Sequence, residues 1–422
     1  MADTASFSAA MKTKLIGPIR DNLPKGKPLL WGDPEANPTD FKGILPQSEG
    51  IDFVGNDFRI PIKAERNNAV GFRSENELLP VPGRSTYTYM QEPMRYAYAA
   101  FNITGQLIKA SETNEGAFKQ AFKAEMEDTI LALKLDVNRA AHGDGSGTIA
   151  VTTANALLAA TALVVDTTVN FYGGEIFDVV NAAGVVISPA HRVVSIVRST
   201  RTLTISPGLA AGTTATTHFL VRSSASSTIA VPNNSQNKEI QGLDSIVAAT
   251  GNLHGLNPAT YSFWRSLVTA VGGALSEQNL RDAKDSIGFE QGLQSVDQGM
   301  DFAMITTRGV RSRFATLLQT GTRNYNDAGN MKLQGGFDSV MFDSQPIFTD
   351  DQCRPGNLYG LAINRLFWAQ MSDWEWLEED GKVLKWDTNR DRYLAVLYKY
   401  CQLGTTHRGA HFKLTGLTDD VR

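Results

Sequence analysis

Cysteine is scarce in this sequence: Cys353 and Cys401 are the only two among 422 residues. They lie far apart and do not match the CxxC spacing of zinc or redox motifs. A disulfide framework is therefore excluded as the main source of stability, and a reducing compartment is expected.

Long apolar runs are also missing. Lys12, Lys14, Pro18 and Arg20 interrupt the N-terminal stretch, so it lacks the apolar core of a signal peptide. No window approaches the roughly 20 apolar residues that a transmembrane helix needs. We therefore expect a protein that is made in the cytoplasm and has no membrane partner.

The chain has no excess of positive charge. Its formal net charge is −4, with 42% hydrophobic and 20% charged residues, which is ordinary globular composition. A dedicated nucleic-acid binder usually carries a concentrated basic excess. The composition argues against that class, although it is compatible with loose, non-specific contact with DNA.

Catalytic motifs are lacking as well. The glycine loop His142–Gly147 has no Lys-Ser/Thr ending and follows a predicted helix, whereas a phosphate loop precedes one. His407 and His411 have the spacing of helical metal ligands, but glycine between them predicts coil. The acidic segment 374–381 is typical of a solvated turn. We predict no enzymatic activity, no catalytic residue, no cofactor and no metal site.

Residues 1–55 are predicted to form an extended arm. Prolines and glycines recur through the segment and prevent a long helix. Large apolar side chains such as Trp31 and Phe41 are nevertheless present, so a free linker is not expected. Two interpretations remain open: the arm lies on another subunit, or it packs on its own domain.

Residues 56–110 indicate a long two-stranded excursion. Phe58, Ile60 and Ile62 alternate with charged residues, and alternation returns through Met94, Tyr96 and Tyr98. The polar, glycine- and proline-rich tip between them carries Arg66, Phe72, Arg73, Glu75 and Glu77. An isolated hairpin of this length is marginal in water, so we expect it to need a partner surface.

Residues 112–142 give the clearest helix. One apolar stripe follows spacings of three and four residues, and at 1.5 Å per residue the helix would run on the order of 40 Å. Gly143 is a natural stop. The stripe consists of Phe118, Phe122, Met126, Ile130, Leu133, Val137 and Ala141.

Residues 147–236 have a different composition. Lysine is absent between Lys134 and Lys238, and short runs with β character are separated by glycine-containing turns. This pattern predicts a small β-barrel or sandwich that is inserted after the helix.

The remaining chain mixes helices and strands. We predict helices beginning at Pro258 and spanning 276–287 and 310–319, and strands at 302–306, 358–362 and 392–400. The fold class is therefore α+β.

The order of these pieces resembles the Hong Kong 97-type major capsid protein of tailed bacteriophages, in its siphovirus-like branch. The strings that carry the resemblance are Val70–Asn76 in the hairpin, Ile103-Thr104-Gly105 before the helix, Leu135–Arg139 running into Gly143–Gly147, Ile240–Ile246 after the insertion, and Asp373–Leu377 followed by Asp380–Val383. The resemblance covers nearly the whole chain.

The resemblance implies a division of the chain. It assigns 1–55 as N-terminal arm, 56–110 as extended E-loop, 111–146 as peripheral domain with the spine helix, 147–236 as inserted β domain, 237–290 as peripheral domain again, 291–390 as axial domain, and 391–422 as the C-terminal strand and tail of the peripheral domain.

It also implies a function. The protein would self-assemble as hexamers and pentamers into the icosahedral virion shell around double-stranded DNA, in the host bacterial cytoplasm. A separate scaffolding protein, a portal protein, non-specific DNA on the inner face and a possible decoration protein would be its partners. The alternative is another phage assembly protein, such as a tail tube or decoration protein. The predicted inter-subunit contact residues are Arg66, Phe72, Arg73, Glu75, Glu77, Trp31 and Phe41.

Overall fold

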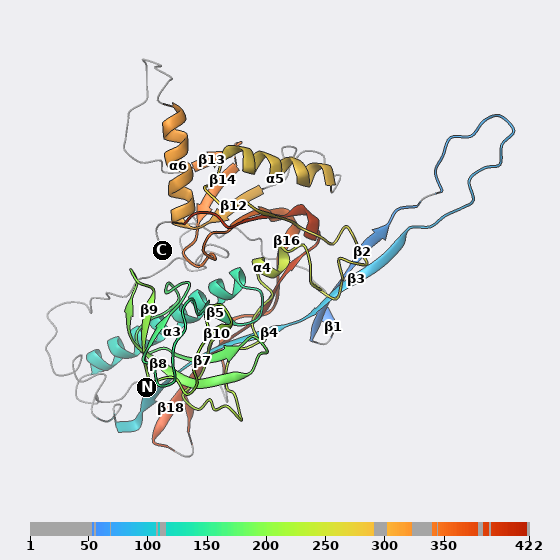
Figure 1. The fold of residues 1–422 in the computed structure, drawn as a ribbon. Helices are drawn as coiled ribbons and strands as arrows, with labels where there is room; N and C mark the ends of the chain where they lie inside the picture. Colours follow the sequence, from blue (N-terminus) through green and yellow to red (C-terminus); the bar gives the residue numbers. More distant parts are fainter. Residues whose placement is uncertain are drawn as a thin grey trace. The chain divides into compact units, whose positions relative to one another are not determined.

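A computed structural model gives the architecture of the chain (Figure 1). It describes residues 53–54, 56–67, 69–106, 109, 115–290, 302–322, 340–343, 345–378, 383–387 and 390–419. The chain divides into two compact units. Among the described residues, the first contains Arg95–Asn138 and Gln370–Cys401, and the second contains the residues up to Met94, Arg139–Ala369 and the residues from Gln402 onward. The predicted arm, with Trp31 and Phe41, lies outside the described residues.

The first unit is built on long antiparallel strands. Its four-stranded sheet has the order β16-β18-β17, and β4 also pairs with β18. Helix α3 contributes Met126 to the cluster of Phe101, Ile103 and Ala395 on one face of the strands. The elements are β4 (Arg95–Thr104), α3 (Glu115–His142), β16 (Leu366–Trp376), β17 (Lys385–Trp386) and β18 (Arg392–Thr405).

Helix α3 confirms the predicted long helix and its end at His142. The Gly143 amide donates to the carbonyl of Ala140 at 3.0 Å, which closes the last turn. Leu133, Val137 and Ala141 of the predicted stripe are buried. The C-terminal end is buried beyond that stripe, because polar residues such as Arg139 are enclosed as well. The expectation of a single buried face therefore does not hold at this end.

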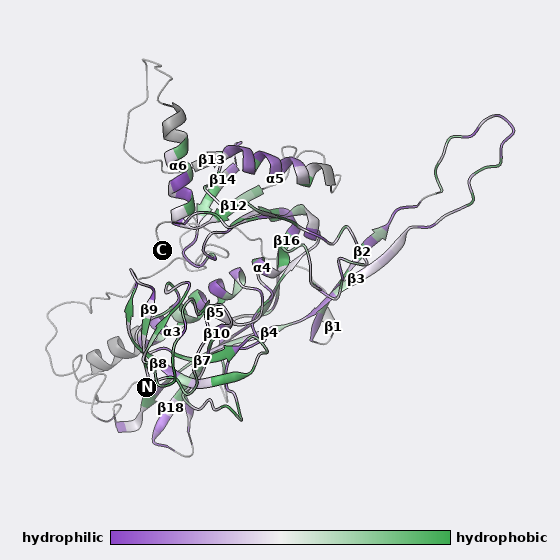
Figure 2. Ribbon diagram, viewed as in Figure 1, coloured by the Kyte–Doolittle hydropathy of each residue, from purple (hydrophilic) through white to green (hydrophobic). Residues whose placement is uncertain are grey.

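The second unit contains a mixed six-stranded sheet in the order β11-β19-β15-β12-β14-β13. Strand β12 is buried at every position and packs among apolar residues of helices α5 and α6. Figure 2 shows the difference between hydrophobic β12 and largely hydrophilic α5. The elements are β11 (Leu267–Ala270), α5 (Glu277–Glu290), β12 (Phe302–Thr306), α6 (Arg308–Thr322), β13 (Val340–Phe342), β14 (Gln345–Thr349), β15 (Leu358–Ala362) and β19 (Phe412–Thr415).

A second six-stranded sheet of this unit has its own apolar core, which includes Phe171, Phe177, Leu203 and Leu220. Its order is β5-β10-β7-β8-β9-β6. The edge strands β5 and β6 are joined through the Thr152↔Val165 bridge, so the sheet closes on itself. The strands are β5 (Thr148–Val151), β6 (Ala162–Val164), β7 (Ile176–Asn181), β8 (Val186–Val197), β9 (Thr202–Ser206) and β10 (His218–Arg222). We call residues 148–222 the barrel.

The predicted hairpin is present in a shorter form. Strand β2 (Asp57–Glu65) pairs antiparallel with β3 (Thr86–Pro93), and β1 (Phe53–Val54) pairs with β2. Strand β4 was expected to continue the return strand but pairs with β18 instead. Strand β3 ends at Pro93, which has no N–H for a further ladder bond, and Met94 lies between β3 and β4.

One predicted helix is wrong. The segment after Pro258 forms turns, in which the Thr260 and Tyr261 amides donate to the Asn257 carbonyl at 3.0 and 2.9 Å. The Trp264 indole is completely buried and donates to the carbonyl of Leu253 at 3.1 Å, so tertiary packing overrides the local helical pattern. Three short helices complete the description: α4 (Leu243–Ile246), η1 (Ile363–Arg365) and η2 (Arg408–Ala410).

Candidate assembly surface

The tip of the β2–β3 hairpin is the most exposed apolar segment of the described chain. We define the tip as residues 66–85, the open loop that follows β2 in Figure 1. Five large apolar side chains on it are more than four-fifths exposed, and Phe72 is completely exposed. Several large apolar side chains exposed on one loop indicate an interaction site. The five residues are Val70, Phe72, Leu78, Leu79 and Val81.

Local hydrogen bonds shape the middle of the tip. The Arg73 guanidinium donates to the carbonyls of Phe72 and Leu78 at 2.9 and 3.1 Å. The Ser74 amide donates to a Glu77 carboxylate oxygen at 2.9 Å. Asn76 has a positive φ of 73°, which a short polar side chain tolerates. Arg73 and Glu77 therefore hold a turn that presents Phe72 to solvent.

The structure places five predicted contact residues together. Arg66, Phe72, Arg73, Glu75 and Glu77 are all exposed on the tip. The sequence reasoning missed the apolar residues Val70, Leu78, Leu79 and Val81, because nearby proline and glycine indicated an ordinary polar turn. Their apolar character beside a β-hairpin was the signal that could have identified them. Trp31 and Phe41 lie outside the described residues.

The base of the hairpin is anchored by aromatic packing within the second unit. Phe58 of β2 is completely buried, and its ring meets His254 and Phe367 edge-on at centroid distances of 5.5 and 5.6 Å. Met90 of β3 is equally buried. The hairpin is thus fixed at one end and exposed at the other.

His254 connects the anchor to strand β3. Its carbonyl accepts a hydrogen bond from the Gln91 amide at 2.9 Å, and its Nδ1 lies 3.6 Å from the Glu92 carboxylate. Complete burial lowers the pKa of His254, and nearby Glu92 opposes this only in part. The imidazole is therefore neutral at pH 7, which is consistent with its packing against the rings of Phe58 and Trp264.

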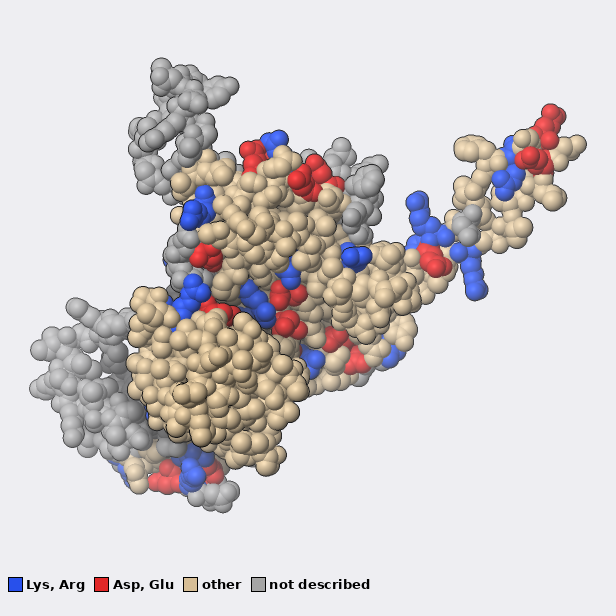
Figure 3. Space-filling view, viewed as in Figure 1, with Lys and Arg blue, Asp and Glu red and all other residues tan. Residues whose placement is uncertain are grey.

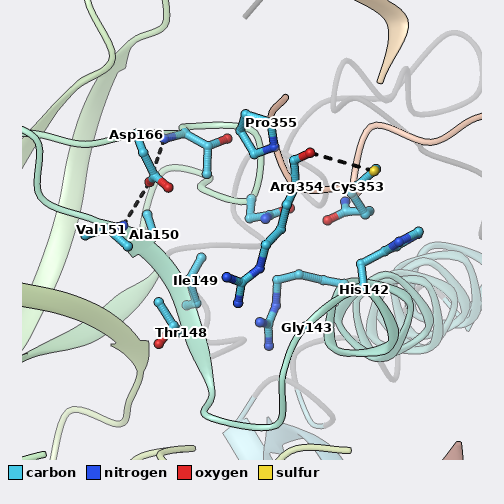
Figure 4. A pocket seen from close by; sticks show the side chains of 14 residues that line it. His142, Gly143, Thr148, Ile149, Ala150, Val151, Asp166, Cys353, Arg354 and Pro355 are labelled. Atoms are coloured by element: carbon cyan, nitrogen blue, oxygen red, sulfur yellow. Dashed lines mark hydrogen bonds between the residues drawn. The ribbon is translucent and has the colours of Figure 1, made fainter. Parts of the chain in front are cut away.

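A small polar cavity lies between the barrel, the end of α3 and the loop before β15 (Figure 4). It encloses about 50 Å³, more than the roughly 15 Å³ that one water needs. Three buried polar atoms of its lining residues have no hydrogen-bond partner in the described part of the chain, namely His142 Nδ1, Asn170 Oδ1 and Gln352 Oε1.

The charges around this cavity compensate one another. Arg354 lies 3.4 Å from Asp144 and 3.2 Å from Asp244. Burial raises the pKa of Asp244, but Arg354 and Lys413 outweigh this effect and lower it overall. Asp166 accepts hydrogen bonds from the amides of Val151 and Thr167, both at 2.8 Å. The arrangement is an ion-paired joint at the entrance to the barrel.

The two histidines considered as metal ligands are not arranged as such. Both ring nitrogens of His411 are used, by the Ala362 amide at 3.2 Å and the Thr405 hydroxyl at 2.9 Å. Among the described residues, no group of three or more His, Cys, Asp or Glu side chains is placed to hold a metal ion. None of the described helices has the length and apolar character needed to cross a membrane.

Comparison with solved structures identifies the fold. The chain is similar to a structure from the cyanophage A-1(L) capsid asymmetric unit, with a TM-score of 0.54 and 13% sequence identity over 87% of this chain and 90% of that chain. Weaker matches include the capsid of a native GTA particle and the holo-SrpI encapsulin complex of Synechococcus elongatus PCC 7942. Each has a TM-score of 0.46 and 10% identity; the first covers 98% of this chain and 99% of that chain, the second 100% and 97%.

No protein-family model matches the chain, and no curated protein matches it by sequence. The structural likeness nevertheless establishes the class: this chain has an α+β capsid-protein fold. The resemblance to Hong Kong 97-type capsid proteins is thereby confirmed at the level of the fold.

Proposed function

We propose that this chain is a major capsid protein, which assembles with copies of itself into the icosahedral shell of a tailed phage. The observation that carries the proposal is the capsid-protein fold, which it shares over most of its length with the cyanophage A-1(L) capsid structure. The hairpin tip adds independent support, because its apolar side chains are exposed in the single copy and need a covering surface.

The alternative was a tail tube or decoration protein. Such proteins are expected to be mostly β. The 28-residue helix α3 and the mixed sheet with helices α5 and α6 favour a shell subunit over that class.

Within this proposal, the described elements take family roles. The hairpin within 56–110 acts as the E-loop, and α3 within 111–146 acts as the spine helix. The barrel within 147–236 is an inserted domain. Residues 237–290 and 391–422 belong to the peripheral domain, and 291–390 belong to the axial domain. The arm, 1–55, stabilises the shell by lying on a neighbour.

The proposed partners follow from the same role. Copies of the chain form hexamers and pentamers, and the shell encloses double-stranded DNA through non-specific contacts. A separate scaffolding protein and a portal protein participate in assembly in the host cytoplasm, and a decoration protein binds the outside. The chain's formal net charge of −4 agrees with loose rather than specific DNA contact.

The test is to express the full chain and to examine it by electron microscopy and sedimentation. Closed icosahedral shells are expected; tubes would favour the tail-tube alternative, and monomers that bind to preformed shells would favour a decoration protein. The variant Arg73→Glu provides the matched comparison. It should leave the subunit's denaturation midpoint unchanged, because Arg73 is exposed, and it should reduce particle yield. A normal yield would contradict the role of Arg73 at the interface.

A further inference from the structure

A cleft lies between the barrel and the start of helix α6. It encloses about 560 Å³, which is within the range of pockets that bind small molecules. Its lining includes three arginines: Arg198 and Arg201 of the turn between β8 and β9, and Arg308, the first residue of α6. We call it the arginine cleft. In Figure 3, the visible face of the barrel shows no Lys, Arg, Asp or Glu side chain, and charged side chains gather along its edge.

The barrel concentrates its positive charge at this turn. Residues 148–222 contain no lysine and four arginines, of which two stand in the turn 198–201. Arg201 has a φ of 52°, in the left-handed region that glycine and asparagine adopt most readily. The geometry of the turn alone therefore disfavours arginine at this position, and a role for its side chain in the cleft explains its presence.

Main-chain carbonyls of the barrel hold two of the guanidinium groups at the cleft. Arg198 Nη1 donates to the Thr168 carbonyl at 2.9 Å, and Arg201 Nη1 donates to the Asp166 carbonyl at 3.3 Å. A guanidinium has several N–H donors, and within the described chain each of these two groups makes one hydrogen bond. Their other N–H groups can bind a ligand, and their planar geometry matches the oxygens of a phosphate.

The start of α6 adds further positive potential to the cleft. The first amides of a helix have no partner within the helix, and Gly309, the second residue of α6, lines the cleft. The Thr307 hydroxyl accepts a hydrogen bond from the Val310 amide at 3.4 Å, but the first turn of α6 contains no acidic residue. Arg308 therefore adds to the positive end of the helix instead of offsetting it, and the region favours an anion.

Two aspartates also line the cleft, and they offset the three arginines only in part. Asp351 accepts a hydrogen bond from Arg308 at 2.7 Å, but the two side chains are 46% and 69% exposed. Exposed ion pairs contribute little, so an incoming anion can displace Asp351. The Asp166 carboxylate is directed to the barrel backbone, where it accepts hydrogen bonds from two amides, and burial raises its pKa. The cleft therefore keeps an excess of positive charge.

We propose that the arginine cleft binds a phosphomonoester of small-molecule size, with its phosphate group between Arg198, Arg201 and Arg308. A phosphate carries a charge of about −1.5 to −2 and three acceptor oxygens, which suits three guanidinium groups that are partly offset by carboxylates. The volume of the cleft leaves room for the rest of the molecule. A DNA duplex is a poorer fit, because it is a stiff rod that a cleft of this size cannot enclose. The bound ligand would connect the barrel to α6, a property that goes beyond the proposed shell function.

Isothermal titration calorimetry of the full chain, in buffer without phosphate, tests the site. The probes are a deoxynucleoside monophosphate and the same nucleoside without its phosphate. The monophosphate should bind and the nucleoside should not. Arg201→Gln and Arg308→Gln should each weaken binding on the order of tenfold or more, since each removes a charged donor to the phosphate. Arg192→Gln, at an exposed barrel arginine that does not line the cleft, is the matched control and should leave binding unchanged.

Hydrogen exchange supplies a second readout, which locates the ligand. The monophosphate should slow exchange in peptides that contain 198–201 and 307–311 and should leave the hairpin peptide 86–94 unchanged. A short DNA duplex, with and without a terminal phosphate, distinguishes a small ligand from DNA. The inference would be overturned if the duplex bound more tightly than the monophosphate and equally well in both forms. It would also be overturned if no phosphate compound bound, or if binding persisted in both Arg201→Gln and Arg308→Gln. Shell formation is measured separately, so its failure would leave this inference intact.

Discussion

Replacing Phe58 by alanine tests how the hairpin is anchored. Phe58 is completely buried, and its ring makes edge-on contacts with His254 and Phe367. Each aromatic contact contributes about 0.5–1.5 kcal/mol beyond burial, and truncation of a buried phenylalanine typically costs about 3–5 kcal/mol in all. Most hairpin residues beyond the base are exposed or half-exposed, so Phe58 contributes much of the packing between the hairpin and the rest of its unit. The lost free energy should therefore appear first as local detachment of the hairpin.

Hydrogen exchange followed by mass spectrometry measures this effect. A loss of about 3 kcal/mol corresponds to an increase on the order of 100-fold in exchange by local opening. The expected site is the peptide 86–94, where the Gln91 amide donates to the His254 carbonyl and the Met94 amide donates to the Asn56 carbonyl.

The control is Leu79→Ala at the tip, where the side chain is 82% exposed, and it should leave this exchange unchanged. If Phe58→Ala accelerated exchange equally in the buried strand β12, the hairpin base would be part of the global core and the reasoning would be refuted.

Three further predictions concern stability. Buried Arg408 donates hydrogen bonds to the carbonyls of Ile246, Gly251, Ser245 and Thr250. Arg408→Met should therefore lower the free energy of unfolding by about 3–5 kcal/mol, measured by urea denaturation. A loss below about 1 kcal/mol would contradict this role. Burial lowers the pKa of His411 to about 3, whereas in the unfolded chain this residue takes up a proton near pH 6.5. The contribution of neutral His411 to the free energy of unfolding should therefore be fully present above pH 6.5 and fall by about 1.4 kcal/mol per pH unit from pH 6 to 5. A constant urea midpoint over this range would argue against a buried, neutral His411. Residues 147–238 expressed alone should melt cooperatively with a β-type circular dichroism spectrum, because the barrel has its own core, and a random-coil spectrum would count against this.

The sequence predicted elements well where burial follows a simple period. The apolar run Leu358–Ala362 is a strand that is buried at all five positions, and the periodic stripe in 112–142 corresponds to helix α3. Ser276 also accepts a hydrogen bond on its hydroxyl from the Asn279 amide at 3.2 Å, next to the predicted start of α5. In these segments, local preference and tertiary burial favour the same structure.

The errors arose where distant parts of the chain decide the outcome. The alternation through Met94, Tyr96 and Tyr98 was read as the return strand of the hairpin, but Tyr96 and Tyr98 belong to β4, which pairs with β18 about 300 residues away. The helix expected after Pro258 gave way to the burial of Trp264. Neither partner can be identified from local periodicity, and topology of this kind is the least predictable level.

The candidate surface was predicted in part. The charged and aromatic tip residues Arg66, Phe72, Arg73, Glu75 and Glu77 were recognised from the hairpin pattern, and all are exposed. The cluster of Tyr96, Tyr98, Tyr398 and Tyr400 on β4 and β18 was not recognised. Tyr96 and Tyr98 stand some 300 positions from Tyr398 and Tyr400, and only the strand register brings the four rings together.

The two connections of the barrel to the rest of the chain suggest that the barrel can be replaced by another domain. The chain enters and leaves at one point, where the Asn237 amide donates to the Ser146 carbonyl at 2.9 Å. The entropic cost of closing a loop rises only slowly with its length. A folded domain of another size could therefore replace the barrel at the same two connections with little loss of stability in the rest of the chain. Glycine is required at position 147 of this connection, because a Cβ there would lie 2.5 Å from the Ser235 carbonyl oxygen. A variant that keeps Gly147 and replaces only the strands beyond it would therefore carry a foreign domain while the fold of the remaining chain is unchanged.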